Sequence, residues 1–107
     1  MILEHFIDSK AQQLIKYASA YFSGQLLYNE LHLFIWDTLE EWAQYSVTSC
    51  AECDDYERVF WYLIHQLEYW PEAELIHNQP LRLHIQYCLR FLQGSGIAPA
   101  NCIGIRP

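Results

Sequence analysis

Two cysteines, Cys50 and Cys53, are separated by two residues, the spacing at which paired thiols chelate one metal ion or form a redox pair. A zinc ion needs further ligands, and His84 and Cys88 are four residues apart, which places them on one face of a helix. These four residues are the candidate metal ligands. Cys102 follows in a tail without helical periodicity, has no neighbour at a ligand spacing and adds nothing to the set.

The residues around the C-x-x-C motif disfavour thiolate chemistry. Glu52, Asp54 and Asp55 are acidic and oppose ionisation of nearby thiols. Thioredoxin-like redox proteins have a strand–helix–strand pattern around this motif, and no such pattern precedes it in this sequence. Cys88 falls on an apolar helical stripe, where a free cysteine packs as a small hydrophobic residue. We therefore predict a chain with no cofactor, and a helical metal or redox module using Cys50 and Cys53 is the alternative.

No catalytic pattern is apparent in the remaining polar residues. The five histidines form no H-E-x-x-H motif, and no glycine-rich loop suited to phosphate is present. A nucleophile–histidine–acid triad cannot be assigned from spacing alone. The sequence therefore predicts a protein that is not an enzyme.

Negative charge dominates the chain and is concentrated in its middle. The 107 residues include 13 acidic and 6 basic side chains, and the net charge is −7. Residues 30–74 contain eleven carboxylates and a single basic residue, Arg58. This charge disfavours binding to nucleic acid or to an anionic membrane and favours a basic protein partner, although helix-surface carboxylates can also be simply solvated.

Aromatic residues favour the partner-binding interpretation. The chain has 4 Trp, 8 Tyr and 5 Phe, more rings than a core of this size readily buries, and exposed Trp and Tyr among carboxylates are typical of interaction surfaces. Alternatively, the exposed rings are buried by self-association, in a homodimer whose interface contains Trp61 and Tyr62. The candidate partner-binding residues are Asp37, Glu40, Glu41, Trp42, Asp54, Asp55, Glu57 and Trp61.

Apolar residues recur at steps of three and four, which predicts helices throughout the chain. The expected buried stripe of the second helix is Leu31, Phe34, Ile35, Thr38 and Trp42, and that of the last helix is Leu81, Ile85, Cys88 and Leu92. The first helix ends at Ser23-Gly24, with Gly24 in a left-handed conformation, and Asn29 is the expected cap of the second. Ser49 and Glu52 fit a capping box at the start of the third. The fourth opens at Asn78-Gln79-Pro80 and ends at Gly94, and Pro71 stops the third or begins a short turn.

These elements predict an all-α fold: a compact antiparallel bundle of about four helices in a single domain over residues 1–107, with an irregular tail from 95 to 107. The N-terminal residues carry no basic leader of the kind found in secretory signals. The longest uncharged stretch, residues 91–105, is interrupted by Gly and Pro and does not predict a membrane span. Four cysteines in such a chain are expected to be reduced thiols in the cytoplasm.

The stretch from Tyr21 to Trp42, Tyr-Phe-Ser-Gly-Gln-Leu-Leu-Tyr-Asn-Glu-Leu-His-Leu-Phe-Ile-Trp-Asp-Thr-Leu-Glu-Glu-Trp, resembles the first helix–Gly–helix turn of small helical bacterial immunity proteins. In that family an apolar helix ends at a glycine and an acidic, aromatic-rich helix follows. The resemblance covers about a fifth of the chain. It implies an acidic cytoplasmic bundle that binds and blocks a toxin. The leading interpretation is an immunity- or inhibitor-type partner of a basic bacterial protein, and a homo-oligomeric structural or regulatory domain is a further alternative.

Overall fold

The computed structural model describes residues 2–44, 54–95, 102, 104 and 107. Within these residues the chain is all-α, as predicted, and contains no strand. Five helices are present rather than four, because the residues after Pro71 form a short helix instead of a turn. The helices are α1 (Ile2–Phe22), α2 (Tyr28–Ala43), α3 (Asp55–Tyr69), α4 (Glu72–His77) and α5 (Gln79–Leu92).

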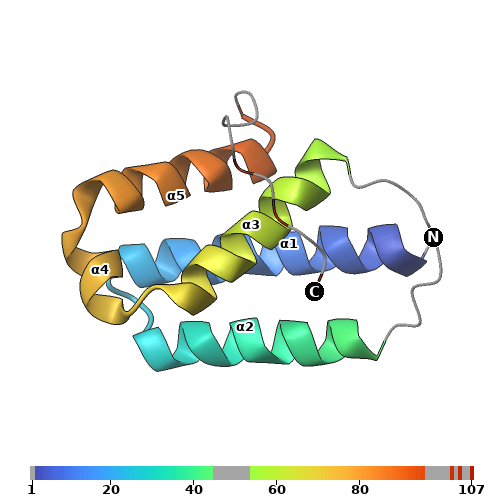
Figure 1. The fold of residues 1–107 in the computed structure, drawn as a ribbon, viewed down its shortest axis with the longest axis horizontal. Coiled ribbons are helices and arrows are strands. Elements are labelled where there is room, and N and C mark those ends of the chain that lie inside the picture. The colour runs from blue at the N-terminus through green and yellow to red at the C-terminus, as the bar shows by residue number, and fades with distance from the viewer. Residues whose placement is uncertain (1, 45–53, 96–101, 103, 105–106) are drawn as a thin grey trace.

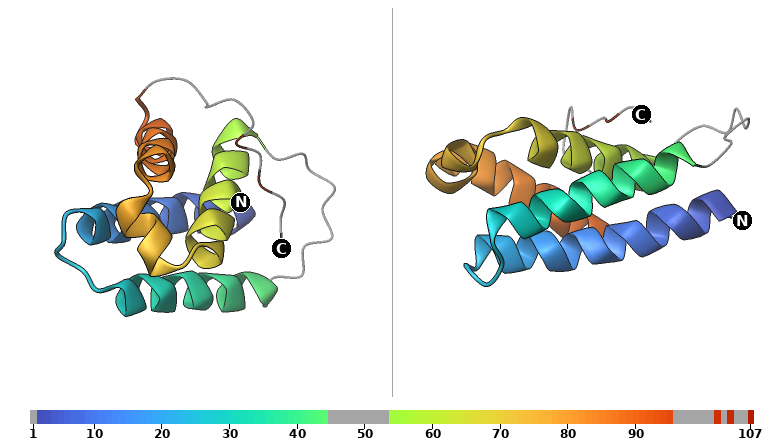
Figure 2. Two further views of the ribbon diagram at one scale, coloured as in Figure 1. Left: turned by 60° about the vertical axis from the view of Figure 1, so that its left-hand side comes forward. Right: turned by 90° about the horizontal axis from the view of Figure 1, so that it is seen from below.

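The helices pack around α1, which contacts α2, α3 and α5. α2 runs antiparallel to α1 along one edge of the molecule, and α3 crosses α1 diagonally (Figure 1). Two further views show α2 and α5 on opposite sides of the molecule, with α1 and α3 between them (Figure 2). The diagonal course of α3 departs from the simple antiparallel bundle that the periodicity predicts.

The core consists of the helical stripes that the sequence predicts. On α1, Ile7, Ala11, Leu14 and Ala18 are buried at steps of three and four. On α2 the predicted stripe is also buried, on α5 it is buried except for the half-buried Leu81, and α3 contributes seven buried side chains. The buried residues of these three helices are Leu31, Phe34, Ile35, Thr38, Trp42, Glu57, Val59, Phe60, Trp61, Leu63, Ile64, Leu67, Ile85, Cys88, Leu89 and Leu92.

Helix ends were predicted with mixed success. Gly24 has the predicted left-handed conformation, with φ of +80°, and the next amide, Gln25 N, donates to Ala20 O at 2.8 Å. Asn78 caps α5 by accepting from Leu81 N at 3.1 Å, also as predicted. The cap assigned to Asn29 is wrong, since α2 begins at Tyr28 without a side-chain cap.

The predicted start of the third helix is also wrong. α3 begins at Asp55, and its cap is Asp54, whose carboxylate accepts from Glu57 N at 2.8 Å. Ser49 and Glu52, the expected capping box, lie outside the described residues. The acidic residues at this point of the chain therefore shape the helix start directly.

The C-terminal tail contacts α2 and α3. Gly104 is buried, and its amide donates to Arg58 O of α3 at 2.9 Å. A Cβ added at Gly104 would lie 2.1 Å from Tyr62 N and 2.5 Å from the Trp61 carbonyl carbon, so the backbones approach too closely for any side chain. The Trp42 indole donates to Pro107 O at 3.3 Å. The described tail residues form no helix, as predicted. Hydrogen bonds hold Gly104 against α3 and Pro107 against α2.

Candidate functional site

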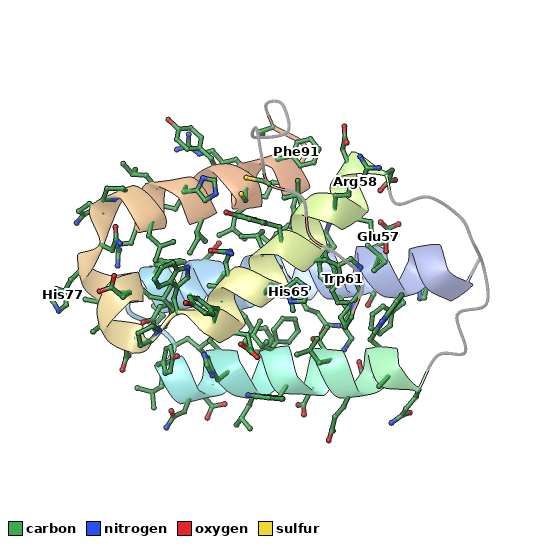
Figure 3. The ribbon with its side chains drawn as sticks, in the orientation of Figure 1. Glu57, Arg58, Trp61, His65, His77 and Phe91 are labelled. Atoms are coloured by element: carbon green, nitrogen blue, oxygen red, sulfur yellow. The ribbon has the colours of Figure 1, made fainter. Side chains whose placement is uncertain are left out.

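Three of the predicted partner-binding carboxylates stabilise the start of α3. Asp54 is the cap, and Asp55 lies exposed in the first turn with a long ion pair of 3.9 Å to Arg58. Glu57 is buried, and its Oε2 accepts from Trp61 Nε1 at 2.9 Å (Figure 3). These contacts explain the carboxylates through capping and core packing, with no need of a partner.

The two predicted aromatic anchors do not reach the surface. Trp61 is fully buried and Trp42 is 5% exposed, and their rings pack edge to face with centroids 4.8 Å apart. A residue that anchors a partner inserts its side chain into that partner, so the burial of Trp42 and Trp61 leaves neither ring exposed for such a role. The homodimer seam predicted at Trp61 and Tyr62 is likewise unsupported, because Tyr62 is half-buried and packs beside His84.

The outward face of α2 carries exposed apolar side chains beside two of the predicted partner-binding carboxylates. Leu33 is 56% exposed and Trp36 is 54% exposed, one turn apart. Asp37 and Glu40, two predicted site residues, are exposed beside them, as is Glu30 one turn earlier. We call these five residues the α2 face. Trp36 was missed as an anchor, although it lies off the core stripe of this helix.

Glu41 lies on the same helix but plays a different part. Its carboxylate forms an ion pair with Lys10 of α1, whose ammonium is the more buried partner. Because this pair joins α1 to α2, Glu41 is less available to a partner than Asp37 or Glu40. α2 contains no Lys or Arg, so its four carboxylates leave a strongly negative surface.

The predicted metal ligands are placed only in part. Cys50 and Cys53 lie outside the described residues. His84 and Cys88 lie one turn apart on α5, as predicted, and the third residue beside them is Cys102. One ligand atom from each of these residues lies within 4.8 Å of the others. The prediction that Cys102 adds nothing is therefore wrong, because the fold brings the tail back against α5.

The geometry of this cluster is tight. Cys88 Sγ donates to Cys102 Sγ at 3.6 Å, and Cys102 Sγ is 3.4 Å from His84 Nε2. The Tyr62 hydroxyl, from α3, shares a hydrogen bond of 2.7 Å with the same Nε2. Cys88 and Cys102 are buried, and His84 is half-buried. We call His84, Cys88 and Cys102 the thiol–imidazole cluster.

The surroundings of Cys88 favour the neutral form of its thiol. Burial raises the pKa of the Cys88 thiol well above its usual range, and the hydrogen bond and charge of Cys102 act in the same direction. Burial also raises the pKa of Tyr62, with the two cysteines as further causes. A thiol that resists ionisation is a poor nucleophile, so Cys88 lacks the character of a catalytic cysteine. Its donor atoms are those that bind soft or borderline metal ions.

A sequence signal for Cys102 did exist. Gly94, with φ of +93°, ends α5, and glycine and proline recur before Cys102, so the chain can reverse direction there. This signal predicts that the chain reverses direction, but it does not predict which helix the tail then contacts. Contact with α5 depends on the packing of Gly104 against α3, which no local pattern encodes.

Comparison with known proteins adds no assignment, since no protein-family model, no curated protein and no solved structure matches the chain. Among the described residues, no helix combines the length and apolar composition needed to cross a lipid bilayer.

Proposed function

We propose that this chain is a non-enzymatic protein-binding module that presents the α2 face to a basic partner, in the manner of an immunity or inhibitor protein. The single observation that carries the proposal is the exposure of Trp36, 54% of whose surface is open to solvent on a helix with four carboxylates and no Lys or Arg. Trp is the residue most enriched among binding hot spots, and leaving it in water is costly unless something covers it.

Charge complementarity selects the class of partner. Glu30, Asp37 and Glu40 surround the apolar pair Leu33 and Trp36, which gives an apolar centre with a negative rim. Such a rim speeds association with a basic surface and disfavours acidic ones. Asp37 and Glu40 are the steering charges of this proposal, and Trp36 replaces Trp42 and Trp61 as its anchor.

The test is a capture experiment with matched surface variants. Four forms of the chain are immobilised: the wild type, Trp36→Ala, the double variant Asp37→Lys/Glu40→Lys, and the control Tyr87→Ala. Tyr87 is 59% exposed on α5, on the other side of the molecule. We expect capture of a basic protein by wild type and by the control. Binding to Trp36→Ala should be weaker by about 30-fold, since truncation of an anchor costs about 2 kcal/mol.

Surface plasmon resonance then separates the two contributions. Charge reversal at Asp37 and Glu40 should slow association and reduce its salt dependence, whereas Trp36→Ala should mainly speed dissociation. Binding that survives Trp36→Ala and charge reversal alike would overturn the proposal. So would sedimentation showing that the α2 face binds only a second copy of this chain.

A further inference from the structure

We propose that His84, Cys88 and Cys102 form a zinc site in which two cysteine sulfurs and one imidazole nitrogen are the protein ligands. The site is independent of the α2 face and of the C-x-x-C motif. It joins two parts of the chain, since His84 and Cys88 lie on α5 and Cys102 lies in the C-terminal tail.

The two distances that involve Cys102 match those of a tetrahedral zinc site. Zinc–sulfur bonds of ~2.3 Å and zinc–nitrogen bonds of ~2.0–2.1 Å at tetrahedral angles place two sulfurs ~3.8 Å apart and a sulfur and a nitrogen ~3.6 Å apart. The observed separations are 3.6 Å between Cys88 Sγ and Cys102 Sγ, and 3.4 Å between Cys102 Sγ and His84 Nε2. The third pair, Cys88 Sγ and the His84 nitrogen, lies within 4.8 Å. An ion can therefore enter with small shifts at Cys102, provided that this third pair closes by up to about 1.2 Å.

Charge balance also favours a divalent ion. Two thiolates and a neutral imidazole cancel the charge of Zn²⁺, so the buried site would be electrically neutral. Binding would release two protons, one from each thiol, to solvent. Cys₂His donor sets are those of known zinc proteins with three protein ligands, whose fourth position is filled by another ligand or water.

Tyr62 is placed to support the site. Its hydroxyl lies 2.7 Å from His84 Nε2, and it comes from α3, the helix against which Gly104 packs. With an ion bound, this hydroxyl is free to donate to a ligand sulfur or to a bound water. We therefore treat Tyr62 as a positioning residue whose loss weakens zinc binding without removing a ligand.

The consequence for the fold is a metal link between the tail and α5. Gly104 and Pro107 already contact α3 and α2 through one hydrogen bond each. A zinc ion at Cys102 would fix the tail to a third helix. A small domain gains stability from such a link because the ion binds the folded chain, in which the three ligands lie together, and not the unfolded chain.

The experiment uses the full chain, reduced and freed of metal, and titrated with Zn²⁺ or with Co²⁺ as a spectroscopic probe. We expect one ion per chain, a thiolate-to-cobalt charge-transfer band and a rise in melting temperature with zinc. Cys102→Ser and His84→Asn should lose the stoichiometric ion while keeping their helical circular dichroism. Cys50→Ser/Cys53→Ser is the matched control and should retain it. Tyr62→Phe should retain the stoichiometry with about tenfold weaker affinity.

Three results would overturn the site. The first is the absence of zinc from the reduced wild-type chain. The second is loss of the ion from Cys50→Ser/Cys53→Ser together with retention in Cys102→Ser, which would move the metal to the C-x-x-C motif. The third is a mass two hydrogens lower in the purified protein, with Cys88 and Cys102 joined as a disulfide that forms again after reduction even when zinc is supplied.

Discussion

The indole nitrogen of Trp61 donates to the carboxylate of Glu57 one turn earlier on α3, with Nε1 and Oε2 2.9 Å apart and both side chains buried. This bond explains how a carboxylate and the largest fully buried side chain of the described residues share one core. A buried carboxylate is costly unless it accepts hydrogen bonds, and a buried indole needs an acceptor. Each residue therefore supplies part of what the other requires.

We predict that Glu57→Ala lowers the free energy of unfolding by about 2–3 kcal/mol, because the Trp61 N–H loses its acceptor. Glu57→Gln keeps an acceptor oxygen and should cost less than about 1 kcal/mol. Urea denaturation followed by circular dichroism measures both. Glu40→Ala, an exposed carboxylate on α2, is the control and should change stability by less than about 0.5 kcal/mol. Equal losses for the two Glu57 variants would contradict a hydrogen-bonding role.

Truncation of Trp61 should lower the stability of the fold strongly, whereas truncation of Trp36 should hardly change it. Trp61→Ala removes a fully buried ring and is expected to cost about 3–5 kcal/mol of stability. Trp36→Ala should leave thermal stability within about 0.5 kcal/mol of wild type, since the ring is exposed. Differential scanning calorimetry separates the two. A large loss for Trp36→Ala would mean that this ring packs into the bundle and cannot serve as an anchor.

Gly104→Ala should detach the tail from α3. The added Cβ would overlap backbone atoms of Trp61 and Tyr62, which cannot move without distorting the helix. We expect a loss of about 1–3 kcal/mol and faster amide exchange at Gly104. Gly94→Ala is the control, because open space surrounds that position and only its left-handed conformation is strained. If the tail amides of Gly104→Ala stay protected from exchange, the contact of Gly104 with α3 is not what holds the tail.

The stability of the protein should decline at alkaline pH. Burial raises the pKa of Tyr21 and of Tyr28 above 10.0, and the Glu72 carboxylate is the next cause for both. A raised folded-state pKa means that the fold favours the neutral phenol. This contribution is intact below about pH 10 and is lost as pH rises through the folded pKa.

The check is a tyrosinate absorbance titration combined with urea midpoints at about pH 8 and pH 11. Glu72→Gln should lower the apparent pKa of both tyrosines and reduce the alkaline loss of stability. Glu30→Gln, on the outward face of α2, should change neither quantity. Identical titrations for wild type and Glu72→Gln would exclude the carboxylate as a cause. Other charged groups act here as well, namely Arg82 on Tyr21 and Glu68 on Tyr28.

Local sequence patterns determined the helices and most of the core. The stripe of α2 from Leu31 to Trp42 was predicted residue by residue, because helical periodicity depends only on spacing along one chain. Gly24 and Asn78 were likewise assigned correctly, since a left-handed turn and an N-cap are set by neighbouring residues. The start of α3 was missed, because Ser49 and Asp54 are both good caps and the choice between them depends on more than the local sequence.

Tertiary structure alone decided which residues meet. Trp61 lies off the apolar stripe of its own helix, and it is buried because Gly104 and the Trp42 ring cover it from other parts of the chain. His84 and Cys88 were paired from their spacing, but Cys102 joined them only through the return of the tail. Contacts between residues far apart in sequence depend on how helices cross, and helix crossing is set by the packing of all side chains together rather than by any local pattern.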